Sequence, residues 1–334
     1  MKIFISGIAG FLGSHLADAF LNEGFDVVGV DNLIGGYDDN VPNGVTFFKS
    51  SMDDLLELDD MLKDVDIVYH TACTAYEGLS VFSPSLVSNN TYQISVNLMT
   101  AAIRNNVRKF VHCSSMARYG SQPNNPFTED MICKPQDPYG IAKYAAELAL
   151  QNLSETHGTE LVIAIPHNIV GPRQKYDDPF RNVASIMINL MLQNRQPIIY
   201  GDGEQIRCFS DIRDDISILV KFATDDKAVG EIFNIGPDEE PVTINKLAIE
   251  IADILNFPLE PIYEKGRPNE VFHATCSADK IRKFFGYETM FTLRDTLESL
   301  VDYIQSRGAR PFEYHLPIEI NNDKTPSTWT KKKF

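Results

Sequence analysis

Basic residues are scarce in this 334-residue sequence: 30 lysines and arginines stand against 46 aspartates and glutamates, a formal net charge of −16 at pH 7. This balance argues against nucleic acid or an anionic membrane surface as the main partner. It does not exclude small anionic ligands, because a few local arginines are enough to bind a phosphate group.

Cysteine is scarce as well, with five residues, and none are paired at metal-ligand spacing. The odd count predicts free thiols in a reducing compartment and no metal site. No apolar run approaches the ~20 residues of a membrane span. The N-terminus, Met-Lys-Ile-Phe-Ile-Ser-Gly, enters a strand at once, which predicts no signal peptide. We therefore expect a cytoplasmic protein without membrane association.

The first 31 residues form a strand, a glycine-rich loop, a helix and a second strand that ends at an acid. The glycines are Gly7, Gly10 and Gly13, and the acid is Asp31. Glycines let a pyrophosphate approach the helix N-terminus, where free N–H groups and the helix dipole favour negative charge. An acid at this distance hydrogen-bonds an adenosine ribose and repels a 2′-phosphate. The pattern predicts a dinucleotide site that prefers NAD to NADP.

A second pattern follows a strand expected at 108–113. It consists of a serine pair, Ser114 and Ser115, and of Tyr139 four residues before Lys143. In a helix, residues four apart share a face. A nearby ammonium lowers a tyrosine pKa from its usual value near ~10, which makes a usable general base. We hypothesise that Ser115, Tyr139 and Lys143 form a proton-relay site beside a nicotinamide ring. The alternative is an amphipathic helix with a polar face.

The glycine spacing, G-x-x-G-x-x-G, resembles that of the extended short-chain dehydrogenase/reductases, the family of NAD-dependent nucleotide-sugar epimerases and dehydratases that includes UDP-glucose 4-epimerase-like enzymes. The resemblance covers roughly residues 1–308. It implies an α/β fold, with a Rossmann-type doubly wound parallel sheet and a smaller C-terminal α/β substrate domain. It also implies NAD as the cofactor.

The resemblance assigns sixteen residues to NAD binding: Gly7, Gly10, Phe11, Leu12, Gly13, Asp31, Asn32, Ser51, Met52, Thr71, Ala72, Cys73, Asn90, Tyr139, Lys143 and Pro166. Cys73 replaces an alanine of the family's H-x-A-A segment, and it is either a small packed side chain or a reactive thiol. Asn90 stands one residue before the position of a helix asparagine that the family holds near the cofactor.

Four residues match substrate-binding positions of the family. The resemblance implies that one of them, Ser115, hydrogen-bonds the reacting oxygen of the substrate. Asn168 lies in a turn that resembles R-x-x-N-x-Y-G-P, and its neighbour His167 either contacts the sugar or is a structural histidine. Arg207 belongs to Gly201-Asp-Gly-Glu-Gln-Ile-Arg207, and Arg267 to Gly-Arg267-Pro-Asn-Glu. The resemblance implies that both arginines bind the substrate's diphosphate, because a guanidinium is always charged and can hold phosphate oxygens bidentately.

The family reaction, carried over to this chain, begins when Tyr139 takes a proton from a sugar hydroxyl while hydride moves to NAD. Dehydratases of the family carry an Asp-Glu pair directly after the catalytic serine, where this chain has Met116 and Ala117. The remaining outcome is return of hydride to the other face of the sugar, so we expect a nucleotide-sugar 4-epimerase acting on a UDP-hexose or UDP-hexosamine. The alternatives are a reductase, dehydratase or other epimerase of the family, or a non-catalytic binding protein.

We expect an NAD-binding domain at 1–173 and a mainly substrate-binding domain at 174–310, from which some segments return to the first domain. The polar tail, 311–334, has little periodicity and suggests a mobile tail or an arm that wraps another subunit. The resemblance implies a homodimer formed by helices near 86–105 and 139–155; the alternative is that these helices are buried within one chain.

Overall fold

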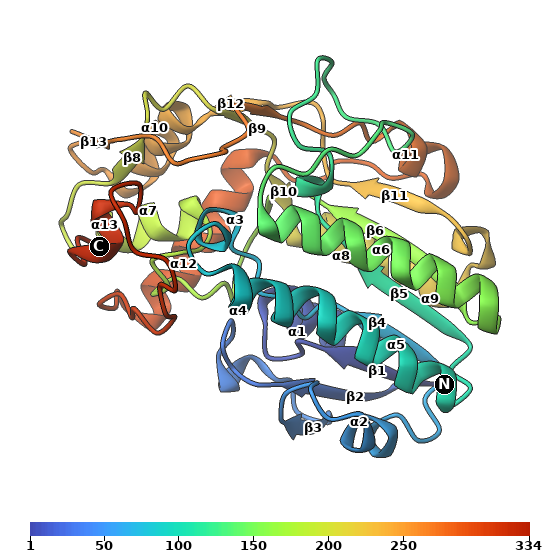
Figure 1. The fold of residues 1–334 in the computed structure, drawn as a ribbon. Helices are drawn as coiled ribbons and strands as arrows, with labels where there is room; N and C mark the ends of the chain where they lie inside the picture. The colour runs from blue at the N-terminus through green and yellow to red at the C-terminus, as the bar shows by residue number, and fades with distance from the viewer.

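The computed structural model describes all residues from Met1 to Phe334, and its centre is a seven-stranded parallel sheet in the order β11-β6-β5-β4-β1-β2-β3 (Figure 1). Its strands are β1 (Lys2–Ser6), β2 (Asp26–Asp31), β3 (Thr46–Lys49), β4 (Ile67–His70), β5 (Lys109–Cys113), β6 (Glu160–Pro166) and β11 (Ile232–Ile235). Because β2 and β3 extend the sheet on one side of β1 and the later strands on the other, the order reverses between β1 and β4. Loops part at such a point and leave a crevice for ligands. The predicted doubly wound sheet is confirmed.

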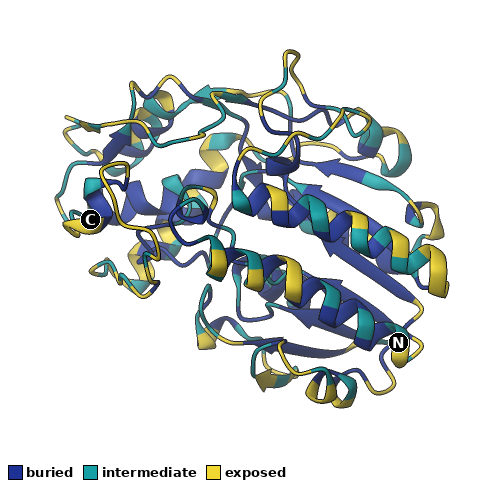
Figure 2. Cartoon of the chain, in the orientation of Figure 1, coloured by how far each residue is buried: buried dark blue, intermediate teal, exposed yellow.

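Helices cover both faces of the sheet, because successive side chains of a buried strand point to opposite faces. In β1, Phe4 joins one core, whereas Ile3 and Ile5 join the other. The first core contains residues of α2 (Leu55–Met61), α5 (Ile94–Arg104) and α6 (Pro138–His157). The second contains residues of α1 (Phe11–Asn22), α8 (Ile212–Leu219), α9 (Lys221–Thr224) and α11 (Asp279–Phe285). Figure 2 shows that the strands are buried, whereas exposed residues lie along the outer faces of α5 and α6.

The single helix expected over 86–105 is interrupted. The chain forms α4 (Pro84–Ser88), a π-helical turn η2 (Asn89–Gln93) and then α5. A π turn inserts an extra residue into a helix and is frequent at functional sites. The hydroxyl of Ser95 donates to the carbonyl of Thr91 at 2.6 Å, which satisfies a backbone acceptor at the irregular turn. Asn90 lies on this turn and faces the large cavity described below.

A third core unites α7 (Val183–Leu192), α10 (Ile244–Leu255) and α12 (Leu293–Arg307). Short strands accompany these helices: β7 (Ile169–Val170), β8 (Ile198–Tyr200), β9 (Ile206–Arg207), β10 (Ser210–Asp211), β12 (Val242–Thr243), β13 (Ile262–Glu264) and β14 (His273–Ala274). The remaining short helices are η1 (Asp38–Asn40), α3 (Glu77–Ser80), η3 (Met116–Arg118), η4 (Asp226–Ala228) and α13 (Ser327–Thr330). At the start of α10, the Thr243 hydroxyl accepts from the N–H of Lys246 at 3.1 Å and so caps the helix.

The C-terminal tail differs from the expected mobile segment or subunit-wrapping arm, because it packs against its own chain. Trp329 is 3% exposed and meets the rings of Phe82 and Phe180 edge-on, with centroids 5.9 and 5.3 Å away. Phe334 is buried in the same cluster. Figure 1 shows the tail, which includes α13, beside α7. Its aromatic partners come from distant loops, so the tail needs no periodic pattern of its own to be ordered.

Three further observations complete the fold. No helix is long and apolar enough to cross a membrane. No group of three or more His, Cys, Asp and Glu side chains is arranged to hold a metal ion. All five cysteines are free thiols.

Candidate active site

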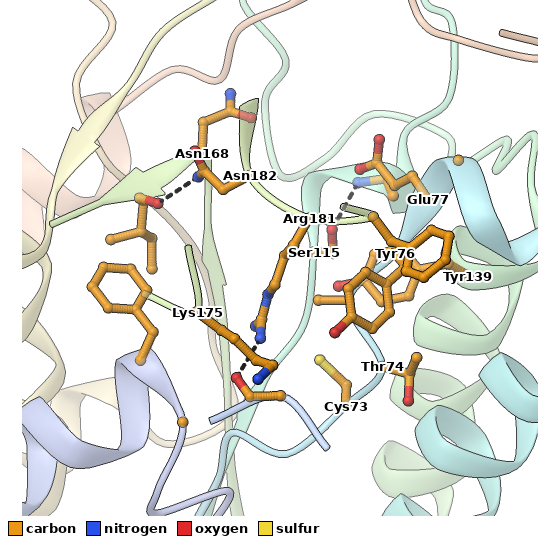
Figure 3. A pocket seen from close by; sticks show the side chains of 18 of the residues that line it. Cys73, Thr74, Tyr76, Glu77, Ser115, Tyr139, Asn168, Lys175, Arg181 and Asn182 are labelled. Carbon is orange, nitrogen blue, oxygen red and sulfur yellow. Dashed lines mark hydrogen bonds between the residues drawn. The ribbon is translucent and has the colours of Figure 1, made fainter. Parts of the chain in front are cut away.

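One large cavity, of about 470 Å³, opens at the carboxyl ends of the central strands. Every residue that the sequence analysis assigned to catalysis, cofactor or substrate lines this cavity. One wall of the cavity is formed by the loops after β1, β2, β4 and β5 of the central sheet. The opposite wall is formed by α7, β8 and the segment around Arg267. Figure 3 shows this cavity from close by.

The two serines after β5 have different surroundings. The hydroxyl of Ser114 donates to the buried carboxylate of Glu147, which also pairs with Arg118 at 2.9 Å. Ser115 is the N-cap of η3, and its Oγ accepts from the N–H of Ala117 at 3.2 Å. Both serines line the cavity, but only Ser115 keeps its hydroxyl proton available to a ligand there.

Tyr139 and Lys143 lie one turn apart on α6, which starts at Pro138 after the N-cap Asp137. Asp137 accepts from the N–H of Gly140 at 2.9 Å, and this bond fixes the turn that carries Tyr139. The ammonium of Lys143 donates to the carbonyl of Cys113 at 2.7 Å. The two side chains therefore share a buried face at the end of β5, as the spacing predicts.

The ionisation of Tyr139 differs from the expectation. Burial raises the pKa of Tyr139 well above its ordinary value, and the Cys73 thiol raises it further, whereas the Ser115 hydroxyl lowers it. Glu77, a nearby acid, also raises it. The protein around Tyr139 thus favours the neutral phenol, and the lowered pKa expected from Lys143 is not found.

The glycine loop leaves space that side chains would fill. A Cβ atom on Gly13 would lie 2.2 Å from the carbonyl oxygen of Gly7, and one on Gly7, which has φ +75°, would lie 2.9 Å from Cα of Ala72. Gly10 is the N-cap of α1 and supplies no side-chain cap, so the first N–H groups of the helix face the cavity unpaired. These donors and the helix dipole fit a pyrophosphate.

Asp31 ends β2 and is nearly buried beside the glycine loop. Its Oδ2 accepts from the N–H of Ala9 at 3.0 Å and its Oδ1 from the N–H of Leu33 at 2.7 Å. Burial raises the pKa of Asp31, and the two backbone bonds oppose that shift. The backbone thus orients the carboxylate at the position where a ribose diol would meet it. Together, the glycine cradle and this acid fit NAD.

The other residues assigned to NAD surround the same part of the cavity. Ser51 and Met52 follow β3, and Thr71 to Cys73 follow β4. Thr71 donates its hydroxyl to the Ser6 carbonyl at 2.6 Å, which ties this segment to β1. The Cys73 thiol is half-buried and lines the cavity near Tyr139.

The two arginines expected to bind a diphosphate lie together. Arg267 pairs with Glu270 at 2.7 Å, and Arg207 approaches the same carboxylate at 4.0 Å. Arg207 also donates to the carbonyl of Val271 at 2.7 Å, and Nε of Arg267 is buried without a partner. The guanidinium of Arg267 lies 5.0 Å from the ring centre of Tyr200. The geometry brings two cations from distant loops to one wall of the cavity.

The segment after β6 separates its two polar residues. Asn168 has φ +45°, lines the cavity and donates to the Cys208 carbonyl at 2.9 Å. His167 is fully buried, and its Nε2 contacts the Pro237 carbonyl at 2.9 Å. Of the two roles left open for His167, the structure supports the structural one.

Many residues that the sequence analysis did not assign also line the cavity, and four of them are important for the arguments below: Glu77, Arg181, Trp329 and Phe334. Glu77 is a carboxylate near Tyr139, so the absence of acids after Ser115 does not leave the cavity without one. The sequence offered no spacing or periodicity that links these four residues.

Comparison with known proteins places the chain in a family. Residues 3–236 match the model of the NAD dependent epimerase/dehydratase family. A UDP-glucose 4-epimerase from Thermotoga maritima, solved with UDP-glucose, is 29% identical, with a TM-score of 0.86 over 92% of this chain and 99% of that one. A UDP-N-acetylglucosamine 4-epimerase from Methanobrevibacter ruminantium is 30% identical, with a TM-score of 0.84 over 92% and 99%.

A third solved structure, the UDP-glucuronic acid 4-epimerase from Bacillus cereus with UDP-glucuronic acid and NAD, is 28% identical, with a TM-score of 0.85 over 92% of this chain and 100% of that one. These similar proteins share a reaction at C4 and a UDP group but differ in the sugar. The family match spans the glycine loop, Asp31, Ser115, Tyr139 and Lys143. The chain therefore belongs to the NAD dependent epimerase/dehydratase family, whose cofactor is NAD.

Proposed function

We propose that this protein is an NAD-dependent nucleotide-sugar 4-epimerase that acts on a UDP-hexose or UDP-hexosamine. The observation that carries the proposal is the meeting of three groups in one cavity: the glycine cradle with Asp31, the trio Ser115, Tyr139 and Lys143, and the pair Arg207 and Arg267. The similarity to three UDP-sugar 4-epimerases supports the UDP group and the C4 position.

NAD, when bound, would accept a hydride from C4 of the sugar and return it. The chain's own residues handle the proton: Oη of Tyr139 takes it from the C4 hydroxyl and gives it back to the same oxygen. Ser115 hydrogen-bonds that oxygen, and Lys143, anchored on the Cys113 carbonyl, offers its remaining N–H groups to the cavity. Burial raises the pKa of Tyr139 and so favours the neutral phenol. To act as a base, Tyr139 therefore needs additional positive charge nearby when the ligands are bound.

Arg207 and Arg267 would hold the diphosphate while the sugar turns over between the two hydride transfers. A guanidinium suits this task, because its charge and fork of donors hold phosphate oxygens from a fixed direction. The residues after Ser115, Met116 and Ala117, carry no acid or base, which favours epimerisation over loss of water at this position.

The test is incubation with UDP-glucose, UDP-N-acetylglucosamine and UDP-glucuronate, with C4 stereochemistry followed by NMR. We expect inversion of at least one sugar with no net change in NADH absorbance. Replacing Tyr139 with Phe should lower the rate by about 10²–10⁴-fold, the usual contribution of a positioned acid–base group. A net change in NADH would indicate a reductase, and a deoxy-keto product a dehydratase.

We further propose a homodimer in which α5 and α6 meet the same helices of a second copy. Three large apolar side chains of this region are exposed: Tyr92 by 38%, Ile141 by 52% and Leu148 by 51%. Ile141 and Leu148 stand two helical turns apart on one side of α6. Light scattering should give twice the mass of the chain, and Ile141→Glu with Leu148→Glu should give a monomer. A monomer of the unchanged chain would contradict this assembly.

A further inference from the structure

The segment between β4 and α4 carries the short helix α3 (Glu77–Ser80) along the wall of the cavity. Distant parts of the chain hold this segment in place. Tyr76 donates its hydroxyl to Asp178 at 2.5 Å, and Ser83 donates to the carbonyl of Pro317 in the C-terminal tail at 2.6 Å. The segment is therefore a fixed wall of the cavity.

Two contacts define the position of α3 within the site. Gly78 lies so close to Arg267 that a Cβ atom added to it would be 3.1 Å from Nη1. The hydroxyl of Ser80 donates to Asp137 at 3.3 Å, and Asp137 precedes Tyr139 by two residues. The helix thus spans the space between the arginine pair and the tyrosine. A sugar that reaches from a diphosphate on the arginines to Tyr139 must lie along α3.

The carboxylate of Glu77 faces the cavity without a partner from the protein (Figure 3). The cations Arg207 and Arg267 turn instead to Glu270, at 4.0 and 2.7 Å. Burial raises the pKa of Glu77, the Asp137 carboxylate raises it further, and the two arginines lower it. The acid is surrounded by the groups at both ends of the sugar's path, yet its oxygens remain free to accept hydrogen bonds.

We propose that Glu77 binds the sugar and selects an uncharged hexose or N-acetylhexosamine over a hexuronate. A carboxylate accepts hydrogen bonds from hydroxyl or amide N–H groups. It repels a second carboxylate placed near it. This assignment rests on the proposed function, since it takes the sugar to lie between the arginine pair and Tyr139.

Two other cations line the cavity, and each has a partner other than Glu77. Arg181 donates to the carbonyl of Gly35 at 2.8 Å, in the loop after β2 on the cofactor side. Lys175 pairs with Asp177 at 3.3 Å. The guanidinium of Arg181 also lies 5.6 Å from the ring centre of Tyr76, which precedes α3. None of these cations pairs with Glu77, so its carboxylate stays open to a ligand along the proposed path of the sugar.

The experiment measures binding, not turnover, by isothermal titration with UDP-glucose, UDP-glucuronate and UDP. The proteins are the unchanged chain, Glu77→Gln, and the control Glu155→Gln, which removes the same charge from an exposed position of α6 outside the cavity. We expect the unchanged chain to bind UDP-glucose about tenfold more tightly than UDP-glucuronate, a modest share of the repulsion between two close carboxylates. Glu77→Gln should abolish most of this preference, while binding of UDP and the preference of Glu155→Gln stay unchanged.

Equal affinity of the unchanged chain for both sugars would overturn the assignment, as would a preference that survives in Glu77→Gln. Glucose 1-phosphate and glucuronate 1-phosphate repeat the comparison without a nucleotide, so the result does not depend on uridine. If the charge preference follows Glu77 but no sugar is inverted at C4, the proposed reaction fails and the role of Glu77 stands. If inversion occurs without a preference that follows Glu77, only the role of Glu77 fails.

Discussion

The two halves of the cavity are built in different ways. In the cofactor half, the glycine loop and Asp31 come from a short stretch of chain: Asp31 accepts from the N–H groups of Ala9 and Leu33, which are 22 and 2 residues away. The other half, which we propose to hold the sugar, is lined by α3, Arg207, Arg267 and the C-terminal tail. It joins distant segments: Tyr76 hydrogen-bonds Asp178 across 102 residues, and Ser83 hydrogen-bonds Pro317 across 234. The comparison shows that a βαβ unit fixes its ligand contacts locally, whereas the sugar pocket exists only once the whole chain has folded.

Replacing Gly13 with Ala should weaken NAD binding without weakening UDP binding. The new Cβ would lie 2.2 Å from the Gly7 carbonyl oxygen, so the loop must open where a pyrophosphate binds. Overpacking of this kind costs about 1–3 kcal/mol, so NAD affinity measured by titration should fall roughly 10–100-fold. Gly158→Ala is the control, because its Cβ meets nothing within 4 Å and the backbone strain at φ +84° lies outside the cavity, so NAD affinity should not change. Equal loss of UDP binding in Gly13→Ala would mean that the halves are not independent.

Replacing Trp329 with Ala should weaken the sugar half alone. The indole loses its edge-on contacts with Phe82 and Phe180. Two aromatic pairs contribute about 1–3 kcal/mol beyond buried area, so the KM for the nucleotide sugar should rise roughly tenfold. Trp329→Phe keeps most of the ring and should stay near the unchanged value. The idea of a tail that closes the sugar half is untenable if Trp329→Ala lowers NAD affinity as much as it raises KM.

Replacing Glu319 with Ala should have the smallest effect, on stability rather than on ligand binding. The carboxylate accepts from the N–H groups of Ser85 and Leu86, each at 2.9 Å, and so caps α4 from the tail. Loss of a cap costs about 1 kcal/mol, measurable as a lower urea midpoint. Asp323→Ala, an exposed acid of the same tail, should leave the midpoint unchanged. Identical midpoints for the two variants would show that the cap contributes nothing.

Much of the site could be predicted from spacing. Tyr139 and Lys143 share a face of α6 because helical periodicity places residues four apart together, and Gly7 and Asp31 meet because consecutive parallel strands lie side by side. The state of Tyr139 could not be predicted in this way. Its pKa depends on burial and on the neighbouring Cys73, Ser115 and Glu77, which come together only through packing.

The sequence by itself determined the doubly wound sheet, the NAD cradle and the family, because these depend on short-range patterns of glycine, acid and apolar residues. Only the tertiary structure decided that Ser114 serves Glu147, that the tail closes the cavity and that Glu77 stands between Tyr139 and Arg267. Those contacts join residues far apart in the chain. The sequence shows no periodic pattern that links the two residues of each contact, because the contact depends on the shape and charge of surfaces that form only on folding.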